Sequence, residues 1–362
     1  MPSMRSIKVL VVDDSPMVRR HLCSVFNEAG MITETASNGR ECLDKISEFK
    51  PQVITLDINM PVMGGIECLQ QIMHKRFTPV IVISSLTKRN AAVTLHALEL
   101  GAVDYIPKPE GGSPSAMEQA KKMLVTKVYN ASQAKQTHKL IGANDASSLG
   151  RNRASDFEKS RPSPTSAAQT QTKIVLIGVS TGGPVTLQKI IPELPASFPV
   201  PIVVAQHMPA RFTSVFSERL NKLSSLTVKE LSNAQTLVAG TAYIAQGDAN
   251  IEMYKEHNKV WARPNTAKSK HIWRPSITHL VESAMLAMPA NQLCLVQLTG
   301  MGNDGASMMA KAQRQGAFTI AESEETCQVY GMPKALIKLN GASKILPDYE
   351  IAKALISLHK LM

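Results

Sequence analysis

Three residues that could form a nucleophilic hydrolase site each stand in a short polar or glycine-rich stretch after an apolar run. Ser180 lies in GVSTGG, His207 in AQHMP and Asp304 in GMGNDG. A serine hydroxyl becomes a nucleophile when a base takes its proton, and a histidine oriented by a carboxylate is such a base. We predict that His207 is this base and that Asp304 orients it. The backbone N–H groups of Thr181 and Met301 would then form the oxyanion hole.

The glycine-rich stretch around Ser180 also allows a different interpretation, a loop that cradles phosphate groups. A dinucleotide-binding loop has the pattern G-x-G-x-x-G, whereas this stretch reads G-x-S-x-G-G, with Ser180 in place of the second glycine. His207 ends the next apolar run, where an acidic residue for the ribose would be wanted. A Rossmann-like nucleotide-binding module without hydrolase activity is therefore the alternative, and nucleotide titration would distinguish the two.

A second group of polar residues ends apolar runs near the N-terminus. Asp13, Asp14 and Asp57 are three carboxylates, and Ser84 and Lys108 end later runs. Three carboxylates that meet at one sheet edge need a cation, and oxygen ligands suit Mg²⁺. An ionised Asp57 beside Mg²⁺ can attack a phosphoryl group. These residues predict phosphorylation of Asp57, with Lys108 as a further positive charge and Ser84 as a contact for a phosphoryl oxygen.

Alternating strands and helices must position both groups. The first 125 residues contain five apolar runs separated by segments with helical spacing, which predicts a parallel sheet with helices on both faces. Long β-rich runs recur at 172–180, 198–207 and 291–300. In such sheets, sites form at the carboxyl ends of the strands. We therefore predict the α/β class, with a doubly wound five-stranded N-terminal domain and a doubly wound, mostly parallel C-terminal domain.

The domain boundaries follow from composition. The stretch that contains SRPSPTSAAQTQT has few large apolar residues, which predicts a flexible linker. We place the first domain at 1–125, the linker at 126–172 and the second domain at 173–362.

Composition also limits the function classes. The net charge of +11 invites a nucleic-acid interpretation, but the second domain is led by strands and is longer than a helix-turn-helix output domain, so we expect no nucleic-acid binding. No apolar run reaches the roughly 18 residues of a membrane span, and the N-terminus does not resemble a signal peptide. The five cysteines form no CxxC pair, so we expect reduced thiols. These features predict a cytoplasmic protein with no membrane insertion. We expect it to be a monomer.

The motifs of both domains resemble known families. VVDDS, LDINMP, SSLT and DYIPKP are similar to the response-regulator receiver, and GVSTGGP, AQHMP, GMGNDGA and VYGMPKA are similar to the chemotaxis protein-glutamate methylesterases of the CheB family. The resemblance covers both domains and leaves out the linker. It implies phosphorylation-activated hydrolysis of glutamate methyl esters on methyl-accepting chemotaxis receptors, with release of methanol and sensory adaptation as the result. It also implies deamidation of receptor glutamines.

The resemblance further implies the partners and the receiver site. A chemotaxis histidine kinase is the implied phosphodonor, and the unphosphorylated receiver is implied to cover the active site. Ester hydrolysis itself is implied to need no cofactor. The implied metal ligands are Asp13, Asp14, Asp57 and Asn59, and the implied switch residues are Ser84, Tyr105 and Lys108.

Three residues depart from the family pattern in the second domain. Gln246 replaces a usual proline, Asn250 stands near a usual histidine, and Thr278 replaces a usual aspartate. The three candidate catalytic residues are unaffected, so these departures bear on which receptor is the substrate. The histidines other than His207 show no partner pattern, and we expect them to be surface or packing residues.

Overall fold

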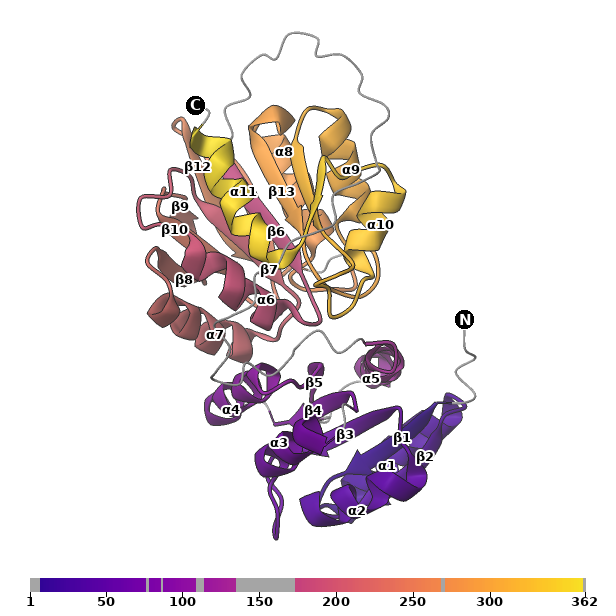
Figure 1. Cartoon of the computed structure of the whole chain (residues 1–362). Helices are drawn as coiled ribbons and strands as arrows, with labels where there is room; N and C mark the ends of the chain where they lie inside the picture. The colour runs from indigo at the N-terminus through magenta and orange to yellow at the C-terminus, as the bar shows by residue number, and fades with distance from the viewer. Residues whose placement is uncertain are drawn as a thin grey trace, which may run out of the picture.

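The computed structural model shows two α/β domains, one below the other in Figure 1. It describes residues 7–75, 78–85, 87–108, 114–134, 173–267 and 271–360.

The first domain is a five-stranded parallel sheet with the strand order β2-β1-β3-β4-β5. Its strands are β1 (Lys8–Val12), β2 (Ile32–Ala36), β3 (Val53–Asp57), β4 (Val80–Ser84) and β5 (Asp104–Pro107). Its helices are α1 (Pro16–Glu28), α2 (Gly39–Phe49), α3 (Gly65–Lys75), α4 (Lys88–Glu99) and α5 (Pro114–Ala131). Every residue of β3 and β4 is buried, as expected for strands covered by helices on both faces.

Local sequence signals begin three of these helices. The side chains of Ser15, Asn38 and Thr87 accept hydrogen bonds from backbone N–H groups in the first turns of α1, α2 and α4. Such caps satisfy N–H groups that have no partner within the helix. Each cap follows closely on a strand, so the polar loops at the sheet edge have defined conformations.

The second domain contains a seven-stranded sheet with the order β15-β14-β13-β6-β7-β10-β8, and all neighbouring pairs are parallel. Its strands are β6 (Ile174–Val179), β7 (Ile202–Gln206), β8 (Thr227–Leu231), β10 (Thr241–Ala245), β13 (Leu293–Gln297), β14 (Phe318–Glu322) and β15 (Lys344–Leu346). A separate antiparallel sheet contains β9 (Gln235–Thr236), β11 (Asn250–Glu256) and β12 (Lys259–Asn265).

Helices connect and cover the strands of the second domain. They are α6 (Gly183–Ile190), α7 (Ala210–Leu223), α8 (Ile277–Ala287), α9 (Ala306–Arg314), α10 (Met332–Lys338) and α11 (Asp348–Lys360). Two short 3₁₀ helices, η2 (Ile191–Glu193) and η3 (Ala290–Gln292), precede β7 and β13. The predicted fold class is therefore confirmed for both domains.

The predicted linker begins inside a helix. α5 continues past residue 125 and ends at Ala131. Residues 135–172 lie outside the described residues, so the flexibility of this segment stays a prediction.

The two domains are in direct contact. Figure 1 shows α4, β5 and α5 on the side of the first domain that faces α6 and α7. The rings of Tyr105 and Phe212 stack across this contact with centroids 4.6 Å apart, and Arg219 forms an ion pair with Glu99. One hydrophobic cluster includes Leu98 and Tyr105 from the first domain together with Phe212 from the second. The apolar core is thus continuous between the domains.

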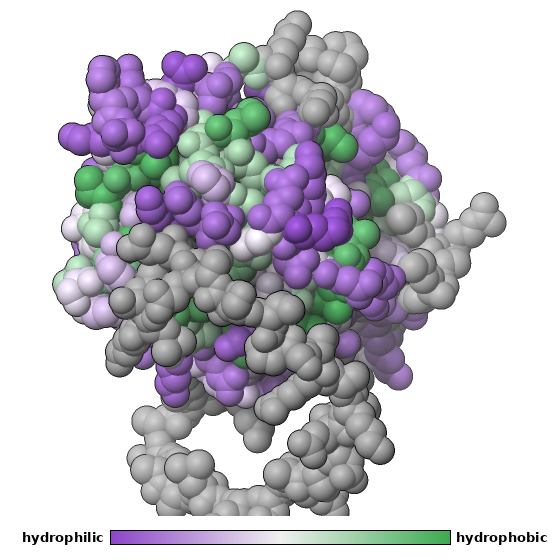
Figure 2. Space-filling model, turned by 90° about the horizontal axis from the view of Figure 1, so that it is seen from above, coloured by the Kyte–Doolittle hydropathy of each residue, from purple (hydrophilic) through white to green (hydrophobic). Residues whose placement is uncertain are grey.

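The face of the second domain that lies away from the first is mixed in character. Figure 2 shows hydrophilic residues interleaved with apolar ones over the described part of this face. Within the described segments, none of the helices combines the length and the apolar character needed to cross a membrane.

Candidate active site

The three predicted catalytic residues meet at the carboxyl ends of neighbouring strands. Ser180 directly follows β6, His207 directly follows β7, and Asp304 lies in the loop between β13 and α9. β13, β6 and β7 are adjacent in the sheet. All three side chains are nearly enclosed, because Ser180 is 8% exposed and the side chains of His207 and Asp304 are 4% and 9% exposed.

A continuous set of hydrogen bonds links the three side chains. His207 Nε2 lies 2.9 Å from Asp304 Oδ2, and His207 Nδ1 lies 3.1 Å from Ser180 Oγ. An ionised carboxylate only accepts hydrogen bonds, so the Nε2 proton of His207 is donated to Asp304. The lone pair of Nδ1 then faces the Ser180 hydroxyl. This is the arrangement that a general base needs in order to take the serine proton.

The backbone after β6 turns sharply to present Ser180. Gly182, the N-cap of α6, has φ +83°, in the left-handed region that glycine adopts at low cost. A Cβ at Gly183 would stand 2.1 Å from Gln206 Oε1, so a larger residue there would displace the Gln206 side chain. Gln206 Nε2 donates to the Ser180 carbonyl at 3.0 Å, and Ser180 N–H donates to the Thr299 carbonyl at 3.0 Å. The neighbouring strand ends thus fix the turn from both sides.

The start of α8 holds the Asp304 carboxylate. The N–H of Ile277 donates to Oδ2 at 2.8 Å, and the N–H of Thr278 donates to Oδ1 at 3.0 Å. The hydroxyls of Thr278 and Ser276 donate to Oδ1 at 2.7 and 3.2 Å. A helix N-terminus stabilises an anion through these unsatisfied N–H groups and its dipole.

This setting keeps Asp304 ionised. Burial alone would raise the pKa of its carboxyl, but the hydrogen bond and charge of His207, with the donors of Thr278 and Ile277, outweigh burial and hold the pKa well below its usual range. Asp304 is therefore a permanent anion at neutral pH, which fixes the tautomer of His207.

Trp273 covers the imidazole of His207. The two rings are stacked, with centroids 4.6 Å apart and an angle of 11° between their planes. An aromatic face attracts a cation, so this contact favours the imidazolium that forms when His207 accepts a proton. Trp273 precedes the α8 cap by three residues, and the same segment therefore contacts both His207 and Asp304.

The two predicted oxyanion donors lie against the first domain. The Thr181 hydroxyl donates to Asp104 Oδ2 at 2.6 Å, and Asn130 of α5 donates to the sulfur of Met301. Lys127 forms an ion pair with the other oxygen of Asp104 at 3.0 Å. Residues from β5 and α5 thus contact both residues that the sequence analysis assigns to the oxyanion hole.

The predicted acidic site lies at the carboxyl edge of the first sheet. One carboxylate oxygen from each of Asp13, Asp14 and Asp57 lies within 4.8 Å of the others. Lys108 Nζ is 2.8 Å from Asp57 Oδ2 and 3.0 Å from Asp13 Oδ2. Burial raises the pKa of Asp57, and the charge of Asp13 adds to this shift, while Lys108 opposes it. A set of hard oxygen donors that also needs positive charge fits a divalent cation such as Mg²⁺.

The remaining predicted receiver residues surround this site. Ser84 ends β4, and its hydroxyl accepts a hydrogen bond from Thr94 at 2.8 Å. Asn59 is exposed, two residues after Asp57. Tyr105 is 3% exposed in β5, with its ring on Phe212 of the second domain. Tyr105 is therefore part of the contact between the domains.

The sequence matches two known families. Residues 9–139 match the response regulator receiver domain, and residues 175–355 match CheB methylesterase. A protein of Rhodospirillum rubrum named protein-glutamate methylesterase/protein-glutamine glutaminase 3 is 45% identical over 352 residues, which cover 95% of this chain and 94% of that protein. The chain belongs to the CheB methylesterase family.

Other members of the CheB family match the whole chain or its second domain. Protein-glutamate methylesterase/protein-glutamine glutaminase 2 of Carboxydothermus hydrogenoformans is 40% identical, with 98% of this chain and 99% of that protein covered. The crystal structure of the Thermotoga maritima CheB methylesterase catalytic domain is 41% identical and has a TM-score of 0.50, with 52% of this chain and 99% of that chain covered. These matches do not support the nucleotide-binding alternative.

Sequence reasoning missed several residues of the CheB site. Trp273 carried no signal, because its contact with His207 depends on a loop that returns from a different sheet. Asn250 and Thr278, which depart from the family pattern, both support this site. Asn250 Oδ1 accepts a hydrogen bond from the N–H of Ser276 at 2.9 Å, and the Thr278 hydroxyl donates to Asp304. The serine before an apolar helical run was the available signal for a cap at residue 276.

Proposed function

We propose that this CheB family member hydrolyses glutamate methyl esters on methyl-accepting chemotaxis receptors through Ser180, and that phosphorylation of Asp57 activates it. The observation that carries this proposal is the hydrogen-bonded set Ser180–His207–Asp304 at adjacent strand ends. The names of the relatives supply the substrate class. Those names also support deamidation of receptor glutamines, with ammonia leaving in place of methanol.

Acylation begins when His207 Nδ1 takes the hydroxyl proton of Ser180 as Oγ attacks the ester carbonyl carbon. The carbonyl oxygen becomes an oxyanion, which the N–H groups of Thr181 and Met301 would receive. The imidazolium then gives its proton to the methoxy oxygen as the carbon–oxygen bond breaks. Methanol leaves, and the glutamyl group is bound to Ser180 as an ester.

Deacylation repeats these steps with water as the nucleophile. His207 takes a proton from a water molecule while the water oxygen attacks the acyl carbon. The proton then passes to Ser180 Oγ, which leaves as the hydroxyl. The receptor retains a glutamate carboxylate, which adds one negative charge and resets the sensory state.

The contact between the domains supports regulation by the receiver. Asp104 and Asn130 lie against Thr181 and Met301, so a receptor helix cannot reach Ser180 until they withdraw. A chemotaxis histidine kinase is the phosphodonor to Asp57. Bound Mg²⁺, held by Asp13, Asp14, Asp57 and Asn59, would neutralise the charge of the phosphoryl group.

Ser84 and Lys108 would contact the phosphoryl group and move when Asp57 is phosphorylated. Tyr105 would transmit this movement to Phe212. We place this activity in the cytoplasm, in a monomer that binds no nucleic acid and does not insert into the membrane.

Methanol release from methylated receptor membranes tests the proposal. The wild-type protein with Mg²⁺ and a small phosphodonor should release methanol, and Ser180→Ala should release none. Ser357→Ala, which changes an exposed serine of α11, is the matched control and should behave as wild type. Methanol release by Ser180→Ala would refute the assignment of Ser180 as the nucleophile.

Failure of the folded wild type on receptor membranes would refute the substrate class. A small synthetic ester would then separate the two parts of the proposal. Hydrolysis that requires Ser180 would keep the nucleophile and leave the receptor assignment wrong.

A further inference from the structure

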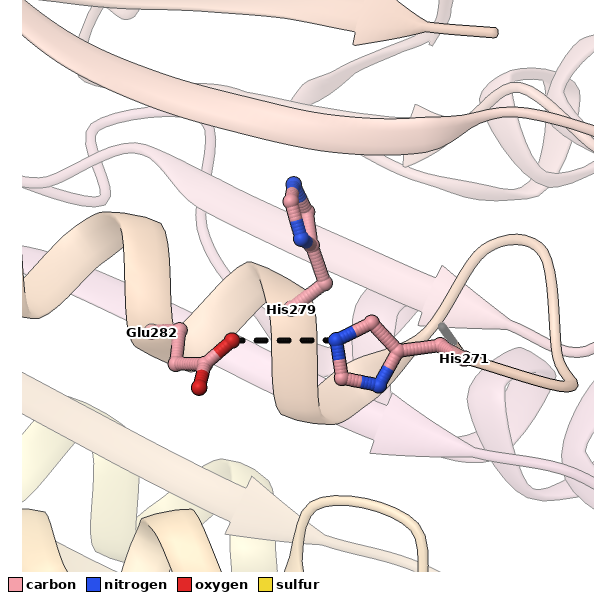
Figure 3. A group of neighbouring side chains, drawn as sticks. All are labelled: His271, His279 and Glu282. Atoms are coloured by element: carbon pink, nitrogen blue, oxygen red, sulfur yellow. Dashed lines mark ion pairs between the residues drawn. The ribbon is translucent and has the colours of Figure 1, made fainter. Parts of the chain in front are cut away.

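Two histidines and a glutamate form a cluster outside the active site. His279 and Glu282 are three residues apart on α8, so they lie on the same face of the helix. His271 reaches them from the segment that precedes the helix, and its Nε2 lies 3.7 Å from Glu282 Oε2. Figure 3 shows His271 and Glu282 facing each other, with His279 rising from the helix between them. His271 and His279 are half-buried, and their rings pack edge to face with centroids 5.8 Å apart.

The geometry of the cluster suits a metal ion. One ligand atom from each residue lies within 4.8 Å of the others. Two ligands bound to Zn²⁺ at about 2.0–2.2 Å in tetrahedral geometry stand about 3.3–3.6 Å apart, close to the separation of His271 and Glu282. Two imidazoles and a carboxylate are a ligand set that Zn²⁺ accepts, with a fourth position left for water.

We propose that His271, His279 and Glu282 bind a Zn²⁺ ion. A metal ion would use a nitrogen of His279 together with ligand atoms of His271 and Glu282. The His271 and Glu282 side chains are 15% and 35% exposed, so an ion from solution can reach them. The site is separate from the acidic receiver site, whose oxygen-only ligands favour a harder cation.

The position of this zinc site gives it a structural consequence. The segment from His271 to Ser276 contains Trp273, which stacks on His207, and ends at the cap of α8. A metal that joins His271 to α8 closes this segment into a loop fixed at both ends. Zn²⁺ would thus hold in place the segment that covers His207 and begins the helix that supports Asp304. The proposal does not depend on the identity of the ester substrate.

Calorimetric titration of the full chain with Zn²⁺ tests the site. The protein is first treated with a chelator and then kept in excess Mg²⁺, which competes for the receiver acids. We expect one Zn²⁺ per chain. Loss of an outer-shell contact costs metal sites about 10–100-fold in affinity, so Glu282→Gln and His279→Gln should each weaken binding at least about tenfold. His74→Ala, which removes an exposed histidine of α3, should bind as wild type.

A second measurement keeps the test independent of any one variant. Zn²⁺ should raise the midpoint of thermal unfolding of the wild type and of His74→Ala, and this rise should be lost in His271→Ala. Circular dichroism checks that each variant is folded. The proposal is overturned if the wild type takes up no Zn²⁺, or if the folded variants bind it as tightly as the wild type.

Discussion

Thr278 allows a quantitative test of how the Asp304 carboxylate is held. Its hydroxyl donates to Asp304 Oδ1 at 2.7 Å, the shortest of the three hydrogen bonds to that oxygen. The same hydroxyl oxygen accepts the N–H of Gly305 at 2.9 Å. Thr278→Val keeps the shape of the side chain and removes both contacts. Oδ1 keeps the N–H of Thr278 and the hydroxyl of Ser276 as donors but loses its shortest hydrogen bond.

The expected effect follows from the value of a hydrogen bond to a charged group, about 1.5–3 kcal/mol. Each 1.36 kcal/mol changes a rate tenfold. If the whole hydrogen-bond energy stabilises the transition state, its loss would lower kcat/KM about 10–100-fold. The other donors compensate in part, so we expect a loss of about tenfold. The loss should fall on kcat, since Thr278 orients the triad through Asp304.

Initial rates of methanol release in the presence of a phosphodonor measure this loss. Thr278→Ser keeps the hydroxyl and is the matched control, with a rate within about twofold of wild type. Circular dichroism establishes that each variant is folded. The reasoning is refuted if Thr278→Val is as active as wild type, or if Thr278→Ser is as impaired as Thr278→Val.

Three further predictions concern other contacts of the structure. Trp273→Ala removes the ring stacked on His207 and should lower kcat/KM about two- to fivefold, from a cation–π contribution of about 0.5–1 kcal/mol. Asp104→Ala removes the acceptor of the Thr181 hydroxyl and should raise methanol release in the absence of a phosphodonor. Burial raises the pKa of Glu322 to about 7, above its ordinary 4.5, so the folded chain keeps a proton that the unfolded chain loses between these values. Stability should therefore fall by about 3 kcal/mol as the pH rises through this window, and Glu322→Gln should remove this dependence in urea unfolding curves.

Each of these predictions has a control and a contradicting result. Trp273→Phe should retain most activity. A fully active Trp273→Ala would show that the contact of Trp273 with His207 does not contribute to catalysis. Asp44→Ala changes an exposed receiver acid and should leave unstimulated release low, and equal release from both aspartate variants would contradict the blocking contact. A pH dependence of stability that is the same in Glu322→Gln and wild type would assign the titration to another group.

The sequence predicts the fold well because the central strands of both parallel sheets are buried on two faces. The runs IVLIGV of β6 and VITLD of β3 are mostly apolar and fully buried. Ser180 follows the first run and Asp57 ends the second, so each run marks both the strand and its functional end. Placement of Ser180 and His207 at neighbouring strand ends follows from this pattern, because parallel strands share one carboxyl edge.

Contacts that join distant segments could not be predicted in this way. Trp273 contacts His207 although β11 and β12, which belong to a separate sheet, lie between the two residues in the sequence. The bond between Thr181 and Asp104 depends on how one domain packs on the other. Neither contact leaves a periodic pattern in the sequence, because each is set by tertiary packing.

Methanol release in four arms tests the central claim that Ser180 cleaves receptor methyl esters under the control of Asp57. Methylated receptor membranes are incubated with wild type, Ser180→Ala and Asp57→Asn, each with Mg²⁺ and a phosphodonor, and with wild type without the donor. We predict rapid release only from wild type with the donor, slow release from wild type without it and from Asp57→Asn, and none from Ser180→Ala. Release from Ser180→Ala, or equal release from wild type and Asp57→Asn in the presence of the donor, would contradict the account.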